Sequence, residues 1–364
     1  MERSNRFKLI EELERMRSSK VICYLTSLRQ NVPAQMADDA VRVVFDHILR
    51  LPSRPVPKLD IFLCSNGGSG TVPWRLVSLF REFSRSIGVL IPYRAYSAAT
   101  LLALGADEIV MHPFGELGPI DPTVSNDFNP VEQGTGRRIG ISVEDVKAYV
   151  NFIKSGVGIT HEDELVRAIE VLASKVHPLA LGNVERFLSQ SRMIATKIMR
   201  THMKEASDHT IQEIVENLAS KLYFHGHPIN RQEAKSDLNL KVMTELPPTL
   251  ETVMWELYLD FEAEFENLKP FNPAADLAAM PDPAQGPKTK NYSIVHAIVE
   301  SAGKCSRHIT ERRYRLMQGP QPGQVGIQEE ILSQEWSHSE EPKAENQPLQ
   351  SSTEPGGAQR AEKG

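Results

Sequence analysis

Ser97 stands at a position where a side chain can do chemistry, between two buried elements of the predicted fold. Residues 88–91 before it form an apolar run typical of a buried strand. The nine residues after it, 98–106, are apolar apart from Thr100 and Gly105, which predicts a buried helix. A serine at this junction can cap the helix, or it can present its hydroxyl as a nucleophile. Its immediate neighbours leave both roles open.

A glycine-rich segment, 65–70, provides a second candidate for chemistry, because it follows one predicted strand and precedes the predicted helix 72–83. Such a loop exposes backbone N–H groups at a helix N-terminus, where an anion or a developing oxyanion can bind. The loop lacks the Lys-Ser/Thr ending of a P-loop and the spacing of a dinucleotide fingerprint, which disfavours nucleotide binding. Taken alone, a tight turn whose glycines supply positive φ is the simpler explanation.

Strands and helices alternate at short intervals along the first third of the chain. Predicted strands cover 21–26, 59–64, 87–91 and 107–111, and predicted helices cover 38–51, 72–83 and 97–106. This order implies an α/β fold with a parallel sheet and helices on its faces. Ligands of such sheets bind beyond the carboxyl ends of the strands. Since Gly67-Gly68 and Ser97 both follow a strand, one crevice can be lined by both.

The rest of the chain predicts further units around this core. Residues 1–18 predict a short charged helix, and residues 19–268 form the main domain. Within that domain, mixed-surface helices at about 142–206 suit an arm that covers the site or meets another subunit. Residues 269–318 suit a linker and a C-terminal extension. Beyond residue 319 the apolar periodicity ends, which predicts a disordered tail over 319–364.

Composition and charge exclude several classes of protein. The chain is 40% hydrophobic and 24% charged, as soluble globular proteins are. A net charge of −6, with Lys and Arg interspersed among Asp and Glu, disfavours a nucleic-acid partner. The three cysteines, Cys23, Cys64 and Cys305, form no disulfide framework and no Cys-x-x-Cys pair, which indicates a reducing compartment. Charges replace the apolar part of a secretory signal, and no 18 apolar residues run together, so we expect a cytoplasmic protein without a membrane span.

Five stretches together resemble a known family far more specifically than any one of them. They are Asn66-Gly67-Gly68, PYRAYSAATL at 92–101, ELGPIDP at 116–122, HPLALGNV at 177–184 and HGHPINRQEA at 225–234. They are similar to the serine dehydrogenase proteinase family, relatives of signal peptide peptidase A within the Clp protease and crotonase superfamily. The resemblance implies a spiral of ββα units with a parallel sheet, a helical arm and a homo-oligomer. It departs from the family at Ala99, where the family usually has glycine.

The resemblance implies hydrolysis of peptide bonds through an acyl-enzyme on Ser97. A hydroxyl at a helix N-terminus suits this role, because the helix dipole favours the negative charge that develops during attack. Backbone N–H groups of Gly67, Gly68 and Ala98 would form the oxyanion hole. The substrate would be a peptide or an unfolded segment of protein, with no cofactor and no metal.

The general base is the open part of this hypothesis. The histidine that Clp proteases place after the serine has no counterpart, since that region holds Gly118, Pro119 and Pro122. A Ser-Lys pair in the manner of signal peptide peptidase A is therefore expected, with a lysine whose pKa is lowered by burial. Lys154, in a Lys-Ser-Gly segment of the arm, is the first candidate. The others are Lys147, Lys175 and Lys197, and a solvated surface lysine stays an alternative for each.

Histidines offer less specific signals. His177, His225 and His227 can approach the crevice, but a hydrogen-bonded structural histidine is the default for each. His112, immediately after a predicted strand, suits a surface or turn residue better than a base. The His-x-His spacing of 225 and 227 has no nearby third ligand, which disfavours zinc. The paired Asp38 and Asp39 suit charges at a helix start better than metal ligands.

Two other functions stay in competition with the peptidase. A catalytically inactive relative would keep the fold and the Gly67-Gly68 loop as a binding or scaffold module. An acyl-CoA enzyme of the crotonase type would use the same oxyanion hole for a thioester enolate. The latter chemistry has no use for a serine at a helix start, and no carboxylate base is obviously placed by either loop.

Overall fold

A computed structural model describes residues 3–120, 123–124, 127–132, 138–221, 226–283, 286–318 and 325–340 of the chain. Its helices are α1 (Arg3–Arg17), α2 (Asp39–Ile48), α3 (Val72–Phe83), α4 (Ala98–Ala103), α5 (Val143–Asn151), α6 (Glu162–Lys175), α7 (Pro178–Arg200), α8 (Asp208–Glu216), α9 (Arg231–Ser236), α10 (Pro248–Phe265) and α11 (Pro273–Ala279). Two π-helical turns, η1 (Phe152–Gly156) and η2 (Asn217–Lys221), continue α5 and α8. The strands are β1 (Lys20–Thr26), β2 (Val56–Cys64), β3 (Ser84–Ile91), β4 (Arg94–Ala95), β5 (Glu108–Met111), β6 (Glu116–Leu117), β7 (Thr123–Val124), β8 (Ile141–Ser142), β9 (Ile229–Asn230), β10 (Val242–Met243), β11 (Thr289–Ser301), β12 (Lys304–Gln318) and β13 (Val325–Glu340).

The main sheet confirms the predicted α/β class. Its order is β10-β5-β3-β2-β1-β11-β12-β13. The strands from β10 to β1 pair in parallel, because each connection crosses over through a helix or a long segment. Their residues are buried almost throughout, as a sheet covered on both faces requires. A small second sheet, β4-β6-β9, stands beside the carboxyl ends of these strands.

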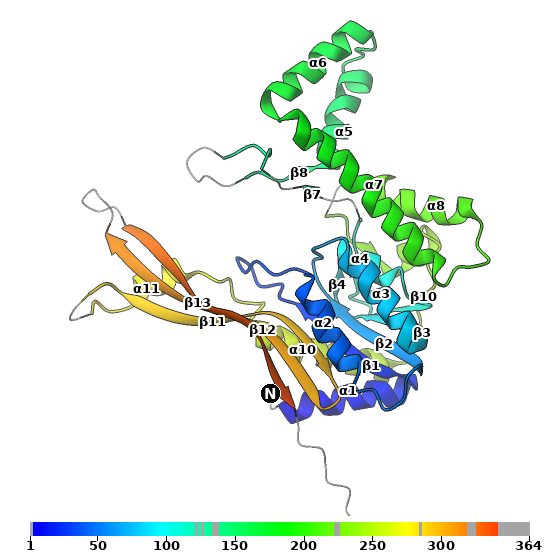
Figure 1. Cartoon of the computed structure of the whole chain (residues 1–364), viewed down its shortest axis with the longest axis vertical. Helices are drawn as coiled ribbons and strands as arrows, with labels where there is room; N and C mark the ends of the chain where they lie inside the picture. Colours follow the sequence, from blue (N-terminus) through cyan, green and yellow to red (C-terminus); the bar gives the residue numbers. More distant parts are fainter. Residues whose placement is uncertain are drawn as a thin grey trace, which may run out of the picture.

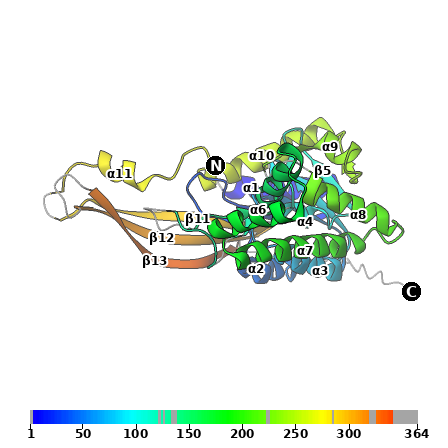
Figure 2. The same cartoon turned by 90° about the horizontal axis from the view of Figure 1, so that it is seen from above.

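Helices cover the parallel half of the sheet on both faces (Figures 1 and 2). On one face α2 and α3 bury apolar side chains against the strands, and α4 and α7 join the same core. On the other face α1 and α10 form a second core with the opposite side of the sheet. The predicted periodicity of α2 is confirmed, since Ala40, Val43, Val44, His47 and Ile48 are its buried residues.

Helix α1 is charged, as predicted for this segment, and it also contributes to the hydrophobic core. Phe7, Ile10 and Leu13 of α1 are buried against α10. Arg6, itself only 3% exposed, lies 3.2 Å from carboxylate oxygens of both Asp260 and Glu300.

A third carboxylate completes this buried cluster, because Glu264 also pairs with Arg6 and with Arg307 of β12. Burial raises the pKa of Glu300, and Arg6 opposes that shift. The ion pairs therefore tie α1, α10 and the strands β11 and β12 together.

The sequence-based boundaries are wrong at the C-terminal side. The antiparallel strands β11, β12 and β13 continue the main sheet from β1, so residues 289–340 are not an extension separate from the core. The disordered tail expected from residue 319 is contradicted over Val325–Glu340, which forms β13, while residues 341–364 lie outside the described residues. Charged and polar residues dominate β13, so its sequence lacks the apolar alternation that predicts a strand. It is ordered as a strand because it pairs with β12.

Two projections extend from the body (Figure 1). The far halves of β11, β12 and β13 form a long β-arm, with α11 lying over it. Helices α5 and α6 form a helical hairpin at the other end, joined to the body through α7. Helices α5, α6 and α7 fall within residues 142–206, where the sequence analysis expected a helical arm, and α7 is the one of them that packs against the core.

Several other features bear on function. All three cysteines are free and buried. Among the residues described, no three His, Cys, Asp or Glu side chains lie close enough to hold a metal ion. None of the described helices is both long and apolar enough to cross a membrane.

Candidate functional site

Ser97 lies in a strained turn between β4 and α4. Its backbone angles are φ 53° and ψ −115°, a conformation that non-glycine residues rarely adopt. Its side chain makes no capping hydrogen bond to the helix. A serine held on a sharp strand-to-helix turn, with no capping bond from its hydroxyl, has the backbone geometry of a nucleophile elbow. The sequence left two roles open for Ser97, helix cap and nucleophile. The structure shows no capping hydrogen bond from its side chain.

Gly67 packs directly against this turn. It has φ +99°, and a Cβ built on it would lie 2.8 Å from the Cβ of Ser97 and 2.7 Å from the carbonyl oxygen of Tyr96. No larger residue fits there. The glycine loop and the serine turn are therefore in van der Waals contact, as the sequence analysis expected of one crevice.

The three amides expected to form an oxyanion hole differ in their availability. The N–H of Gly67 donates to the hydroxyl of Ser65, 3.0 Å away, so it is already used. For Gly68 and Ala98, no hydrogen bond from the N–H to any described residue is found. Both residues line the same cavity as Ser97. Within the described structure, Gly68 and Ala98 can serve an oxyanion, and Gly67 instead shapes the turn.

The motif at 116–122 supports the serine turn from behind. The hydroxyl of Thr100, in α4, lies 2.7 Å from the carbonyl oxygen of Ala95 and 2.8 Å from that of Gly118. The Tyr96 hydroxyl donates to Glu116 over 2.6 Å, and burial and this carboxylate raise the pKa of Tyr96. These bonds lock both ends of the turn.

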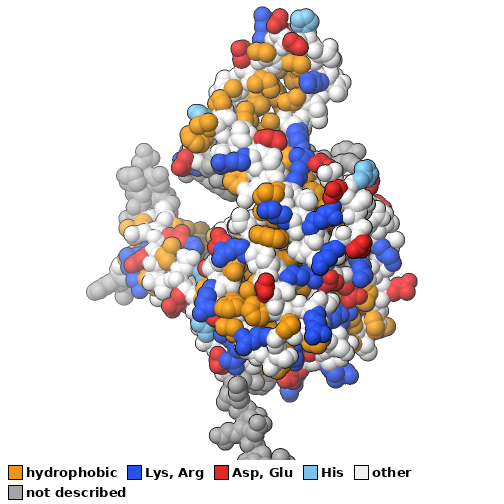
Figure 3. Space-filling model, turned by 45° about the vertical axis from the view of Figure 1, so that its right-hand side comes forward, with side chains coloured by type: hydrophobic (Ala, Val, Ile, Leu, Met, Phe, Trp, Pro, Cys, Tyr) orange, Lys and Arg blue, Asp and Glu red, His pale blue; other side chains and the backbone are white. Residues whose placement is uncertain are grey.

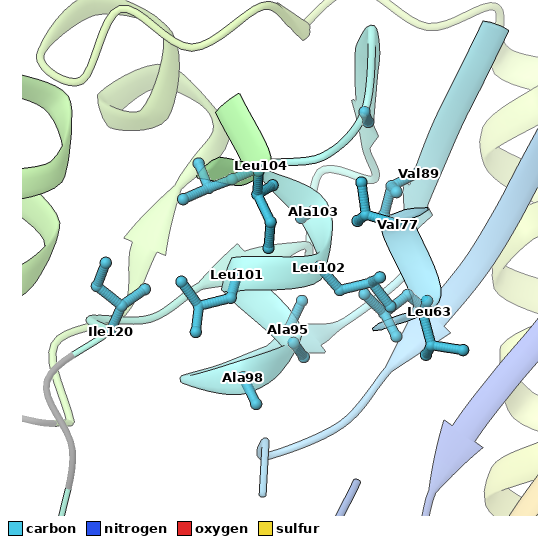
Figure 4. Packing of buried hydrophobic residues seen from close by; sticks show 14 of the residues in the cluster. Leu63, Val77, Val89, Ala95, Ala98, Leu101, Leu102, Ala103, Leu104 and Ile120 are labelled. Atoms are coloured by element: carbon cyan, nitrogen blue, oxygen red, sulfur yellow. The ribbon is translucent and has the colours of Figure 1, made fainter. Parts of the chain in front are cut away.

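Apolar packing holds the same region in place. Figure 4 shows Ala95, Ala98, Leu101 and Leu102 within one cluster, with Ile120 beside Leu101. Ala99 is fully buried in this core and does not line the cavity. Its methyl group therefore packs within the protein and does not narrow the site.

A cavity of about 410 Å³ opens over Ser97. One wall is the glycine loop, from Asn66 to Thr71, and the floor is the serine turn with Leu101 and Ile120. Helix α7 closes the opposite side with Phe187, Gln190, Ser191 and Ile194. The hydroxyl of Ser191 donates to the carbonyl oxygen of Ile120 over 2.7 Å, which fixes the helix to the floor.

No ionisable side chain is found among the described residues that line this cavity. Gln35, Asn66 and Gln190 supply amides, and Phe187 and Ile194 supply apolar surface. The arrangement suits a neutral, extended polar chain with side chains of mixed character. Its described part provides neither a carboxylate nor an imidazole for proton transfer.

The four candidate lysines all lie away from the cavity. Lys154 is exposed in η1 and lines a different groove, between α5 and α6. Lys175 is exposed at the end of α6. Lys197 is on α7, but its Nζ lies over the ring of Trp74, 6.0 Å from the ring centroid. Lys147 is half-buried in α5 and is absent from the cavity lining. The structure of one chain brings none of them to Ser97.

Two of the histidines have structural positions. His112 stacks on Trp255 with ring centroids 5.2 Å apart, and burial lowers its pKa. His177 is the N-cap residue of α7, where its side chain accepts from the N–H of Leu179, and it stacks on Phe128.

The pair at 225 and 227 gives no zinc site within the described structure. His227 lies 2.8 Å from Glu233, and His225 lies outside the described residues. Asp38 pairs with Arg75, while Asp39 accepts from the indole N–H of Trp336. Both aspartates thus have protein partners at the start of α2.

The sequence analysis missed the contribution of α7 and of Gln35. Phe187, Gln190, Ser191 and Ile194 recur at helical spacing and so share one face of α7, but this spacing does not tell what the face contacts. Gln35 comes from the segment between β1 and α2 and carries no local signal at all. Only the packing of α7 beside α4 brings these side chains over Ser97.

Comparison with known proteins adds distant similarity. No protein-family model matches the chain. The uncharacterized protein MJ1495 of Methanocaldococcus jannaschii is 23% identical over 263 residues, which cover 70% of this chain and 76% of that protein. The uncharacterized protein MJ0137 of the same organism is 26% identical over 260 residues, covering 70% and 78%. The similarity extends over most of each protein, and neither name states an activity.

Proposed function

We propose that this chain is a serine peptidase that cleaves peptide bonds through an acyl-enzyme on Ser97. The observation that carries the proposal is the strained backbone of Ser97, with φ 53° and an uncapped hydroxyl, in contact with the Gly67-Gly68 turn. Strain of this kind costs free energy and persists where the surrounding structure enforces it, often at functional sites. Thr100, Gly118 and the packed α4 supply that enforcement.

The mechanism uses two backbone donors and one side-chain nucleophile. Ser97 Oγ attacks the scissile carbonyl carbon while the base takes the hydroxyl proton, and the carbonyl oxygen takes up the negative charge. The N–H groups of Gly68 and Ala98 stabilise that oxygen. The dipole of α4 adds a smaller contribution of the same sign, because Ala98 begins the helix. When this tetrahedral adduct collapses, the C–N bond breaks and the base gives its proton to the leaving amine. Water then attacks the acyl-enzyme with the help of the same base, which releases the carboxylic acid and restores Ser97.

A peptide is the substrate that suits the cavity. The amides of Gln35 and Gln190 can pair with a peptide backbone, and Phe187 and Ile194 can contact its side chains. A cavity of about 410 Å³ accommodates a short stretch of chain.

The base has to reach Ser97 from outside the cavity of a single chain. Lys154 stays the proposed base, and it lies on the helical hairpin of α5 and α6, which projects from the body (Figure 1). The groove beside Lys154 is apolar, and Val166 and Ile169 of α6 are about half exposed. Orange side chains gather on this projection in Figure 3. An exposed apolar face on a projecting hairpin supports a homo-oligomer, in which the arm of one copy carries Lys154 to the Ser97 of another.

A catalytically inactive binding or scaffold protein is the second candidate. It is favoured by one specific observation, that no ionisable side chain lines the cavity within the described residues. The acyl-CoA enzyme fits less well, because forming an enolate needs a base and no described residue that lines the cavity carries a carboxylate.

Labelling with a fluorophosphonate probe tests the nucleophile. The wild type should be labelled, and Ser97→Ala should not. Ser69→Ala is the matched control, since Ser69 lines the same cavity without the strained turn, and it should be labelled like the wild type. Casein cleavage should follow the same order. Absence of both labelling and cleavage in the wild type would support the scaffold instead.

A further inference from the structure

Ser65 lies between β2 and the glycine loop, where it links the two halves of the candidate site. It is 1% exposed and is absent from the lining of the Ser97 cavity, so it makes no contact with a substrate bound there. The proposed chemistry gives it no role. Its backbone and its side chain nevertheless bond to both segments that form the oxyanion hole.

The backbone of Ser65 holds the chain that leads into the serine turn. Its N–H donates to the carbonyl oxygen of Arg94 over 2.8 Å, and its own carbonyl oxygen accepts from the N–H of Tyr96 over 3.0 Å. Tyr96 directly precedes Ser97. The approach to the nucleophile is therefore fixed to the residue that precedes the glycine loop.

The hydroxyl of Ser65 holds the first glycine amide of the loop. It accepts from the N–H of Gly67 over 3.0 Å and lies 2.7 Å from the hydroxyl of Thr26, the last residue of β1. Thr26 is 2% exposed, so this pair of hydroxyls is shielded from water. The two bonds fix the Ser65 oxygen, because a hydroxyl offers one proton and two acceptor sites. They thereby set the orientation of the peptide unit between Asn66 and Gly67.

The next peptide unit, between Gly67 and Gly68, is held from the other side. The N–H of Met36 donates to the carbonyl oxygen of Gly67 over 2.7 Å, and the N–H of Ser69 donates to the carbonyl oxygen of Met36 over 2.9 Å. In a trans peptide unit the C=O and the N–H point in opposite directions. The N–H of Gly68 is therefore directed away from Met36, and Gly68 lines the Ser97 cavity.

Two consecutive glycines need such external bonds. Gly67 has φ +99° and Gly68 has φ +151°, and neither has a side chain that restricts its backbone rotation. A Cβ on Gly68 would lie 2.4 Å from the carbonyl oxygen of Met36, so a larger residue cannot stiffen the loop. The bonds to Ser65 and Met36 supply the restraint instead. Of these two, the bond to Ser65 comes from a side chain and can be removed by substitution.

We propose that Ser65 is a positioning residue of the oxyanion hole, supported by Thr26. Its backbone fixes the approach to Ser97 and its hydroxyl fixes the peptide unit before Gly68, so one residue sets the donor N–H relative to the nucleophile. This role rests on the proposed function, because an oxyanion forms only when Ser97 attacks. Without the hydroxyl, the loop adopts several orientations, and the Gly68 N–H is correctly aimed for only part of the time.

Fluorophosphonate labelling and cleavage of fluorescein-labelled casein test this role in the full chain. Ser65→Ala should be labelled at least about tenfold more slowly than the wild type, since losing one oxyanion donor costs about 100- to 1000-fold in kcat and a misaimed donor costs part of that. For casein, kcat should fall similarly while KM stays within about twofold, because the oxyanion contact is made in the transition state. Unchanged labelling would overturn the proposal.

Ser84→Ala is the matched control for the loss of a buried hydroxyl. Ser84 is 5% exposed, and its hydroxyl donates to the carbonyl oxygen of Phe80 over 2.7 Å. It begins β3, at the opposite end of the parallel strands from the glycine loop. Both variants should lower the urea midpoint by similar amounts, but only Ser65→Ala should slow the labelling. Equal slowing in both variants would attribute the effect to lost stability and overturn the positioning role.

A double substitution tests the part played by Thr26. Thr26→Val removes the second hydroxyl and keeps the side-chain shape. It should slow labelling less than Ser65→Ala does, because Ser65 keeps its bond to Gly67. Since Thr26 acts through Ser65, adding Thr26→Val to Ser65→Ala should cause no further slowing. Effects that multiply in the double variant would overturn the support from Thr26.

Hydrogen exchange gives a readout that needs no catalysis. In a chain with isotopically labelled glycine, observed by NMR, the Gly67 amide should exchange at least about tenfold more slowly than the Gly68 amide, which has no partner among the described residues. Ser65→Ala should remove this difference, and Ser84→Ala should preserve it. An unlabelled wild type with this exchange pattern would contradict the peptidase and leave the restraint by Ser65 intact. A labelled wild type in which both amides exchange equally fast would overturn the restraint.

Discussion

Gly67 and Ser97 are in direct backbone-to-side-chain contact, since a Cβ on Gly67 would lie 2.8 Å from the Cβ of Ser97. Two segments that are far apart in the sequence thus share one tight interface. The glycine loop and the serine turn position each other, and the site depends on both.

Substituting Gly67 by alanine should damage the fold and the site together. The added methyl would meet the backbone oxygen of Tyr96 at 2.7 Å, and φ +99° is unfavourable for alanine. We expect a loss of about 2 kcal/mol or more in the free energy of unfolding, measured in urea, with loss of fluorophosphonate labelling. Gly182→Ala is the matched control. Gly182 lies in α7 with open space around it, so this change should stabilise the chain by up to about 1 kcal/mol. A Gly67→Ala chain as stable as the wild type would contradict the contact.

Replacing Ser97 by glycine should stabilise the protein and abolish labelling. Glycine adopts φ 53° and ψ −115° without strain, and relief of about 1–3 kcal/mol outweighs the roughly 0.5–1 kcal/mol entropic cost of glycine. Ser97→Ala removes the hydroxyl and keeps the strain. Thermal unfolding should therefore rank Ser97→Gly above Ser97→Ala, and the opposite order would show that the turn is not strained.

Removing Arg6 should destabilise the chain strongly. Arg6→Met leaves Asp260 and Glu300 buried without their cation, and breaking a buried ion cluster costs about 3–5 kcal/mol. Arg15→Met provides the control, because its pair with Glu12 is exposed to solvent and contributes little to stability. Urea titrations measure both, and equal effects would contradict the buried cluster.

Stability should fall as the pH drops from 7 to 5, in part through His47. Burial lowers the pKa of His47 from 6.5 to about 3, while its nitrogens bond Ser301 over 2.8 Å and Ser306 over 3.0 Å. The unfolded chain takes up a proton below pH 6.5 and the folded chain does not, so stability is present above pH 6.5 and is lost as the pH falls towards 3. His47 alone should account for about 2 kcal/mol at pH 5. His47→Gln should flatten the profile of unfolding free energy against pH. The exposed His209→Gln is the control, and an unchanged slope in His47→Gln would contradict the assignment.

Mixing two inactive variants should restore activity if the base comes from another copy. The Ser97→Ala chain keeps an intact arm with Lys154, and the Lys154→Ala chain keeps an intact Ser97. In a one-to-one mixture, about a quarter of the sites should therefore combine an intact Ser97 with an intact Lys154 from the neighbouring copy. Casein cleavage measures the recovery. No recovery would place the base elsewhere.

The association that this mixture requires has its own test. Ile169→Lys puts a charge on α6, which has no buried residue, so the free chain should keep its stability while the assembly dissociates. Light scattering measures the assembly, and unchanged mass in this variant would exclude the face of α6 as the interface.

Local patterns in the sequence were sufficient for the parallel core. The predicted helix 72–83 has the same bounds as α3. The strands β1, β2, β3 and β5 coincide with runs of apolar and β-branched residues in the sequence. Each of these helices and strands buries residues at the period of its own type of secondary structure, and this period can be recognised from a few neighbouring residues.

Order at the C-terminal side was not predictable in that way. β13 contains several glutamates and a mixed face, and it is a strand because β12 offers it hydrogen bonds and Arg312 and Arg313 pair with its carboxylates.

The sequence by itself determined the α/β class, the serine between a strand and a helix, and a glycine-rich turn after another strand, because these depend on local periodicity and backbone permissiveness. Tertiary structure alone decided that Gly67 contacts Ser97, that the Gly67 amide is spent on Ser65 while those of Gly68 and Ala98 are available, and that α7 walls the cavity. It also decided that Lys154 lies in another groove, since distances between segments arise only from packing.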